Sequence, residues 1–172
     1  MYDQMIINDE DIAKMGIEGL RAKAIPDRMY RNTSMNHIQT LGATVLARRL
    51  GVELVDELGY DMIYEGRKIS VMTLMAGVDN IESGIMRGQI RDEEANRDCD
   101  RYVFANIDPE IRRIWFAGWI PKEEFYKQAK HTAVGDGVGC WTALWAFWGI
   151  KYDRLATIDT LHQAFHPRRG SG

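Results

Sequence analysis

Two apolar runs flank a short polar stretch near the middle of the chain. Residues 60–64 and 68–75 are rich in Ile, Val, Met and Tyr, and Glu65-Gly66-Arg67 between them suits a tight turn. The pattern predicts a β-hairpin. Because side chains alternate between the two faces of a strand, one face of the second strand carries Lys68, Ser70 and Met72. Asp61, on the partner strand, could point toward Ser70 and Met72.

The remaining periodicity predicts helices and strands in a mixed order. Helices are expected over residues 9–23, 34–50 and 122–130, and further strands over 52–58, 102–107 and 113–120. The last two strands form a second hairpin, because Asp108-Pro109-Glu110 between them is turn-prone. Residues 78–98 have no clean period, and we expect a loop there with a short helical or strand piece.

The segment from Cys140 to Gly149 is unusually aromatic. It holds Trp141, Trp145, Phe147 and Trp148, and each such side chain buries roughly 150–250 Å² when packed. If these rings lie against the sheet, they belong to the core. If they protrude, they mark an interface, because large exposed apolar patches indicate partners. The sequence leaves both interpretations open.

Four segments carry recognisable motifs. Asp61 is followed across the hairpin by Ile69-Ser70-Val71-Met72-Thr73. The other segments are GATVLARRLG at 42–51, DRYVFA at 100–105 and GWIPKEEF at 118–125, of which the last is the most specific. Together they resemble the PD-(D/E)XK, or restriction-endonuclease-like, nuclease family, in the form found in small phage and archaeal proteins. The resemblance covers roughly residues 36–161 of the chain.

The resemblance implies a fold and a domain organisation. The fold class is α/β (α+β), with a restriction-endonuclease-like mixed central sheet flanked by helices and an extra N-terminal helix. We expect a helical extension over residues 1–33, a single nuclease-like domain over 34–166 and a mobile basic tail over 167–172. The 172 residues are enough for one sizeable core.

The resemblance also implies an altered active site. In the family, an Asp and an acidic residue of the hairpin hold a divalent metal, a Lys two positions later serves the attacking water, and a helix Glu adds a carboxylate. Asp61 matches the first position and is the candidate metal ligand. Ser70 and Met72 stand at the acidic and lysine positions, and Thr44 or Val45 stands at the helix position. The implied cofactor of an active site is Mg²⁺ or Mn²⁺, which a thioether suits badly.

Other side chains could take over the missing roles. Lys68 shares a strand face with Met72, and its long stem could deliver an ammonium group to the site. Glu65, Asp79 and Glu82 are candidate migrated acids, each with an ordinary interpretation as a surface charge. Asp61 is either a metal ligand or a hydrogen-bonded turn acid. Whether the chain is an enzyme therefore stays open.

Three functions fit this pattern. The first is a degenerate nuclease fold that has lost phosphodiester hydrolysis and serves as a nucleic-acid-associated or assembly subunit, for instance of a phage. The second is an Mg²⁺-dependent DNA endonuclease with a rearranged site, and the third is a structural, oligomer-forming protein without DNA binding. Where DNA is the partner, Arg87, Gln89 and Arg91 are the positions expected to approach it. The alternative for them is an ordinary solvated connection.

Composition and charge limit the partners and the cellular location to be expected. The net charge of −3 disfavours indiscriminate phosphate binding and leaves a local basic patch as the alternative. No apolar run approaches the roughly 18–20 residues of a membrane helix, and the start of the chain lacks the pattern of a secretory signal. We therefore expect a cytoplasmic protein, in a host cell or a virion, whose partners are copies of itself or other protein subunits rather than a membrane. The two cysteines and four histidines lack metal-site spacing.

Overall fold

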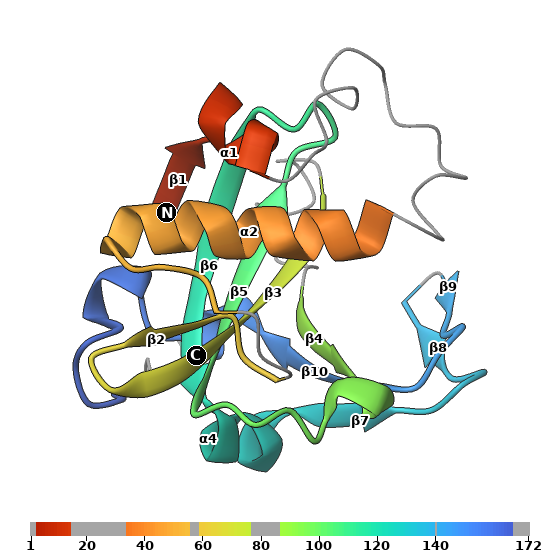
Figure 1. Ribbon diagram of the computed structural model, residues 1–172. Helices are drawn as coiled ribbons and strands as arrows, with labels where there is room; N and C mark the ends of the chain where they lie inside the picture. The colour runs from red at the N-terminus through yellow and green to blue at the C-terminus, as the bar shows by residue number, and fades with distance from the viewer. Residues whose placement is uncertain (1–2, 15–33, 56–58, 77–86, 140, 167–172) are drawn as a thin grey trace.

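The protein has a mixed α+β architecture with a curled main sheet and few helices (Figure 1). The computed structural model describes residues 3–14, 34–55, 59–76, 87–139 and 141–166. The predicted fold class is therefore confirmed at the level of mixed helix and strand. In the described part of the chain, no helix has both the length and the apolar character needed to cross a membrane.

The main sheet has five strands in the order β1-β6-β5-β3-β2. Their bounds are β1 Asp3–Ile6, β2 Met62–Tyr64, β3 Arg67–Met75, β5 Arg101–Ile107 and β6 Arg113–Pro121. Strand β3 runs parallel to β5, and the other neighbours are antiparallel. Both predicted hairpins, β2–β3 and β5–β6, are thus confirmed.

The turn of the first hairpin is tighter than the sequence suggested. Tyr64 pairs with Arg67, so only Glu65 and Gly66 form the loop. Their φ angles are 49° and 71°, as a two-residue type I′ turn requires. This turn fixes the register that places Ser70 one residue beyond the end of the β2–β3 ladder, which closes at the pair Met62 and Ile69.

A second, smaller sheet packs beside the first. It has the order β4-β10-β7, with β4 at Arg87–Arg91, β10 at Phe147–Lys151 and β7 at Lys130–Thr132. A separate two-stranded ribbon pairs β8, Gly137–Val138, with β9, Trp141–Thr142. Strand β4 is the strand piece expected within residues 78–98.

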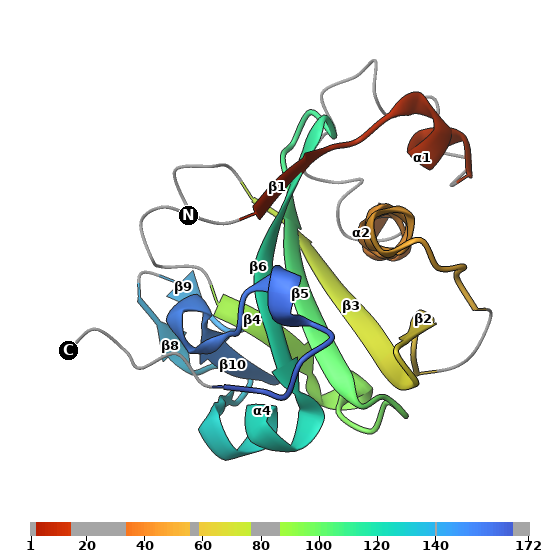
Figure 2. The ribbon, with the colours of Figure 1, turned by 90° about the vertical axis from the view of Figure 1, so that its left-hand side faces the viewer.

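Helices cover the sheets unevenly. Helix α1 spans Asp9–Lys14, α2 spans Ser34–Leu50 and α4 spans Lys122–Gln128, with short 3-10 turns at Asp92–Glu94 (η2), Tyr152–Arg154 (η3) and Ile158–Thr160 (η4). Helix α2 lies on one side of the main sheet, and α4 and the second sheet lie on the other (Figure 2). Gly51, with φ 67°, ends α2 in the left-handed conformation.

Two hydrophobic clusters fill the space on either side of β3. Val71 belongs to the cluster under α2, together with Leu41 and Val45. Met72 belongs to the opposite cluster, together with Phe104 and Phe125. The alternation predicted for β3 is therefore confirmed, and the strand is buried on both faces.

The segment after β10 returns to strand β6. Gly118 has φ 144°, and a Cβ there would lie 2.3 Å from the carbonyl oxygen of Ala156. This close approach lets Trp119 and Ala156 form a β-bridge with two backbone hydrogen bonds of 2.9 Å. The indole of Trp119 also donates to Thr160 Oγ1 at 3.1 Å.

Several predicted boundaries were wrong. The sequence predicted no strand at residues 3–6, yet β1 pairs with β6, because four alternating residues are too short a pattern to recognise. The predicted strand over 52–58 is reduced to a bridge between Leu54 and Met62 within the described residues. Helix α4 stops at Gln128, since Lys130 pairs with Gly149 of β10. Of the helix predicted over 9–23, residues 15–23 lie outside the described ranges, as do Cys140 and the tail.

Replacing Gly42 should destabilise the fold. A Cβ at Gly42 would lie 1.9 Å from Thr73 Oγ1, and Thr73 is 1% exposed. We expect Gly42→Ala to lower the free energy of unfolding by about 1 kcal/mol, because overpacking costs more than the gain in helix propensity. In a Thr73→Ala background the same change should become stabilising. Denaturant unfolding measures both effects.

Gly137→Ala is the matched control, because a Cβ there meets nothing within 4 Å. If Gly42→Ala changed the stability of neither the original protein nor the Thr73→Ala variant, this result would contradict the close packing of α2 on β3.

Candidate functional site

Asp61 lies at the edge of β3, just before β2 begins. Its backbone N–H donates to the carbonyl of Ile69 at 2.8 Å, and its Oδ2 accepts the N–H of Val71 at 2.7 Å. The carboxylate thus continues the β2–β3 ladder by one rung. Asp61 is consequently fixed against the segment that carries Ser70 and Met72.

Burial dominates the electrostatics of Asp61. It raises the pKa of the carboxyl above its ordinary value of 3.8. The hydrogen bond from Val71 and the charge of Arg97 lower this pKa, and the charge of Glu94 raises it. The net direction is upward, so the folded protein holds this proton more tightly than the unfolded chain.

Ser70 and Met72 are both buried on the face of β3 that points away from α2. Ser70 is fully buried and Met72 is 4% exposed. The hydroxyl of Ser70 accepts a hydrogen bond from Arg97 Nη1 at 3.1 Å and lies 3.9 Å from the sulfur of Met72. The acidic and lysine positions of the resemblance are therefore occupied by neutral groups next to an arginine.

Arg97 is the functional residue that the sequence analysis missed. Its Nη2 lies 2.9 Å from Glu94 Oε1, and its carbonyl oxygen accepts a hydrogen bond from Lys122 Nζ. Both Glu94 and Arg97 stand in a highly charged stretch that the periodicity assigns to a solvated loop. The only local signal was their spacing of three residues, which permits an ion pair within one helical turn.

Lys68 is engaged away from Ser70. Its Nζ lies 2.7 Å from Asp98 Oδ2 and 5.1 Å from the centre of the Tyr60 ring. The hydrogen bond with Asp98 raises the pKa of Lys68 and lowers that of Asp98. The ammonium group thus lies with Asp98 and Tyr60 at the exposed start of β3.

Among the candidate acids that the structure describes, none lies beside Asp61. Glu65 is exposed in the hairpin turn, and Asp79 and Glu82 lie outside the described residues. On α2, Thr44 donates its hydroxyl to the carbonyl of Thr40 at 2.8 Å, and Val45 is fully buried in the core. Within the described ranges, no three His, Cys, Asp or Glu side chains form a group suited to a metal ion.

The donors around Asp61 do not suit Mg²⁺ or Mn²⁺. Such ions need several hard oxygen ligands, usually including two carboxylates. One oxygen of Asp61 already accepts the Val71 N–H, the Ser70 hydroxyl accepts from Arg97, and Met72 offers a soft thioether. The positive charge at this place comes instead from a guanidinium group, which has five donors and no acceptor.

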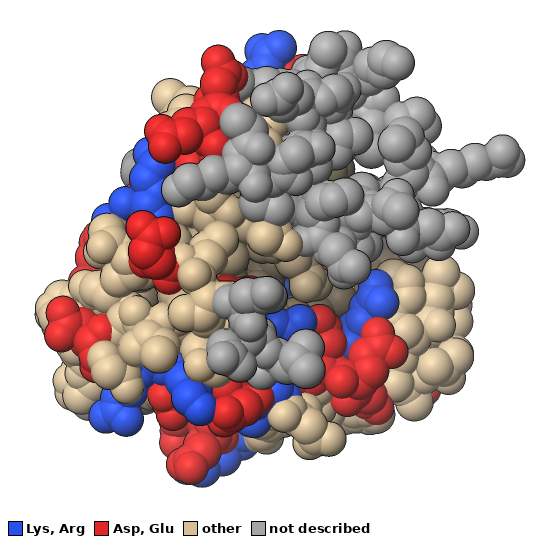
Figure 3. Space-filling view, in the orientation of Figure 1, with Lys and Arg blue, Asp and Glu red and all other residues tan. Residues whose placement is uncertain are grey.

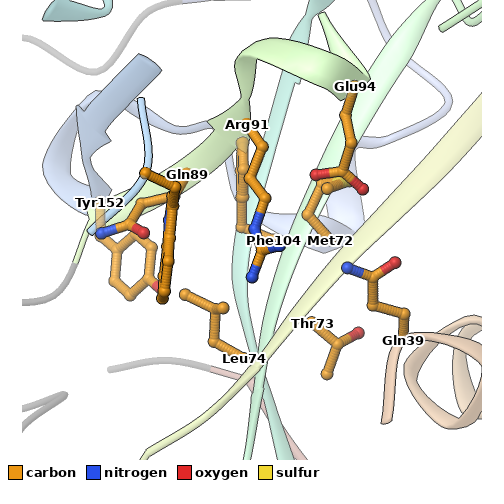
Figure 4. Close-up of a pocket in the computed structure, with 10 residues that line it drawn as sticks. Gln39, Met72, Thr73, Leu74, Gln89, Arg91, Glu94, Phe104 and Tyr152 are labelled. Atoms are coloured by element: carbon orange, nitrogen blue, oxygen red, sulfur yellow. The ribbon is translucent and has the colours of Figure 1, made fainter. Parts of the chain in front are cut away.

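A small pocket opens beside Met72 (Figure 4). It has a cavity volume of about 30 Å³, which is room for roughly two water molecules. Gln39 of α2, Glu94 of η2, and Gln89 and Arg91 of β4 contribute polar groups to its lining. Two of the three residues predicted to approach a nucleic acid thus lie beside the lysine position. Arg87, the third of these residues, is the first residue of β4.

Cys99 supports no redox or metal role. The side chain is buried beside the site, and burial raises the pKa of its thiol to about 11. At neutral pH the group is therefore a protonated thiol and a poor nucleophile.

The chain order around the site is helix α2, hairpin β2–β3, then β5 parallel to β3 and β6 antiparallel to β5. No family model matches the chain, and no curated protein matches it.

The raised pKa of Asp61 makes stability depend on pH. Its contribution to stability is fully present below its ordinary value of 3.8 and is lost as pH rises through the higher folded-state pKa. Asp61→Asn has no such dependence, and its amide oxygen can still accept the Val71 N–H. We therefore expect this variant to gain stability relative to the original protein as the pH rises from below 3.8 to neutral, as urea unfolding measures.

Asp153→Asn, at a carboxylate whose side chain is 58% exposed, is the matched control. If the difference between Asp61→Asn and the original protein stayed constant over this pH range, burial would not govern the Asp61 carboxyl.

Proposed function

We propose that this protein is a PD-(D/E)XK-type nuclease scaffold that no longer hydrolyses phosphodiesters and works as a nucleic-acid-associated subunit. The observation that carries the proposal is the hydrogen bond from Arg97 to Ser70 beside Asp61. At the position where the resemblance places a metal-binding acid, a neutral hydroxyl contacts an arginine cation.

The arrangement of the elements supports a nuclease-type scaffold. The DRYVFA segment forms most of β5, and GWIPKEEF forms the end of β6 and the start of α4. The hairpin holds Asp61 against β3, and α2 covers the opposite cluster. These are the segments on which the resemblance rests, and they pack together on the two faces of the main sheet.

The chemistry of the site supports a loss of hydrolysis. Hydrolysis of this type needs a divalent ion to polarise the phosphate and a group that activates water. A guanidinium group cannot coordinate and activate the attacking water as a divalent metal does. The Met72 thioether cannot replace the ammonium group of the family's lysine. Arg97 pairs with Glu94 and also places a positive charge near Asp61, so the cation beside this carboxylate is a guanidinium group rather than a metal.

The placement of β4 supports a link to nucleic acid. Gln89 and Arg91 line the pocket next to Met72, so a nucleic-acid strand that reached this site would pass over these two side chains. On the face shown in Figure 3, acidic and basic side chains are intermingled. The proposed contact is therefore local and does not use a broad basic surface.

A second candidate function follows from Glu94. Its charge acts on Asp61, so the two carboxylates lie within electrostatic range of each other. If Arg97 moved aside, Asp61 and Glu94 could share a divalent ion, as an active endonuclease with a rearranged site would require.

Metal titration and a nicking assay separate the two candidates. For a hydrolysis-deficient scaffold, calorimetry should show no tight Mn²⁺ or Mg²⁺ binding, and the protein should leave supercoiled DNA intact with Mn²⁺. The triple variant Ser70→Glu, Met72→Lys and Arg97→Ala should gain Mn²⁺ affinity, because it restores a second carboxylate and removes the competing cation.

Tight Mn²⁺ binding by the original protein that Asp61→Ala abolishes and Asp153→Ala preserves would contradict the proposal. Nicking that requires both Asp61 and Glu94 would establish the endonuclease instead.

A further inference from the structure

One face of the second sheet gathers basic residues from all three strands. The antiparallel register places Arg87 opposite Lys151, and Gln89 opposite Gly149, which itself lies opposite Lys130. Directly paired residues point to the same side of a sheet. A Cβ at Gly149 would lie 3.8 Å from Arg87 Cδ, which places the Arg87 side chain over the strand on this side.

The opposite face of the same sheet belongs to the core. Ile90 and Ile150 are buried in the cluster with Phe104, and a Cβ at Gly88 would meet the Phe104 ring at 2.8 Å. The alternation of strand side chains then places the basic set on the other face, which it shares with the buried ring of Phe147. Lys130 and Lys151 are exposed, and Arg87 and Arg91 are partly exposed.

The three strands contain no acidic residue, although the chain as a whole carries a net charge of −3. Their sequences are RGQIR, KHT and FWGIK. The nearest acids follow β4: Asp92 contacts His131, and Glu93 lies 3.5 Å from Arg91. This face therefore combines four cations, Arg87, Arg91, Lys130 and Lys151, on strands without an acidic residue, as a surface that attracts a polyanion does.

Two indoles border the basic face. Trp145 is 41% exposed, and the Arg91 guanidinium lies 4.5 Å from the centre of its ring. Trp141 is 43% exposed and stacks on Phe147 of β10, with ring centres 6.2 Å apart and planes inclined by 17°. Both rings therefore have area free for a further flat partner. Val134 and Leu144 extend the exposed apolar area nearby.

The basic face is continuous with the altered site. Gln89, Arg91 and Trp145 line the same pocket as Met72 and Glu94 (Figure 4). A chain lying along β4 would thus pass from the two indoles to the position where the resemblance places the catalytic lysine.

We propose that this face binds single-stranded nucleic acid. Trp141 and Trp145 stack on bases, and Arg87, Arg91, Lys130 and Lys151 contact phosphates. The proposal rests on the proposed nucleic-acid association and specifies its substrate. Single strands are favoured because indoles can stack only on bases whose faces are open, which the paired and stacked bases of a duplex are not.

Fluorescence anisotropy with labelled oligonucleotides tests the proposal. The probes are an oligothymidylate and an oligouridylate of about 16 nucleotides and a DNA duplex of the same length. Trp145→Ala should weaken single-strand binding roughly 5- to 150-fold, and Trp145→Phe should restore most of it by keeping an aromatic ring. Lys151→Ala should lower the salt slope of binding by about 0.7.

Arg112→Ala is the control for charge, because this arginine is 65% exposed at the turn between β5 and β6, away from the second sheet. Thermal unfolding of each variant establishes that it is folded. The comparison of thymidylate with uridylate shows whether the strand is DNA or RNA.

The outcomes separate this inference from the proposed function. Equal affinity for duplex and single strands, unchanged by Trp145→Ala, would overturn the single-strand site and leave nucleic-acid association standing. Failure to bind any of the probes at low salt would overturn both. A dimer that light scattering detects and Trp145→Ala dissolves would assign the indoles to contact with a second copy and overturn the inference.

Discussion

The burial of β3 on both faces constrains the rest of the molecule. One face meets α2 so closely that Gly42 has room for no side chain, and the other meets the ring of Phe104 and the second sheet. A charge on either face would need a partner within reach, since an isolated buried charge is costly. In the nuclease family that the sequence resembles, a metal and a lysine supply this compensation. Here Ser70 and Met72 are both neutral, so β3 needs neither.

The ion pair of Glu94 and Arg97 places one positive charge and a second negative charge near the Asp61 carboxylate. Asp61 is partly desolvated, and Arg97 opposes the resulting rise of its pKa. Glu94 in turn pairs with Arg97, and Lys122 holds the Arg97 carbonyl. Arg97 thus links Ser70, Glu94 and Lys122 by direct polar contacts and acts on Asp61 through its charge. Such sets act as units, because removal of one member leaves the others without partners.

The sequence predicted what depends on local pattern. Both main hairpins and helix α2 follow from apolar periodicity and from turn residues such as Gly51 and Gly66. The second sheet was not predicted, because its strands have three to five residues each and pair across long stretches of chain. Arg97 was missed for a similar reason: its contact with Ser70 spans 27 positions, and nothing in the charged stretch around it indicates burial. For the aromatic segment, the sequence left core and interface open, and the structure contains both kinds of side chain. Phe147 is buried, whereas Trp141 and Trp145 are exposed.

The pairing of β6 bears on how the protein is made. This strand pairs with Asp3–Ile6 along one part of its length and with Ala156 at Trp119, so segments that precede and follow it in the chain both pair with it. A nascent chain emerging from the ribosome can form the two hairpins early, yet it cannot complete this strand's contacts until residue 156 is free of the exit tunnel. Strand β1 has no partner in the main sheet until β6, more than a hundred residues later in the chain, has been synthesised. Biogenesis therefore leaves an unpaired β-edge on the growing chain, which is where chaperone protection is needed most.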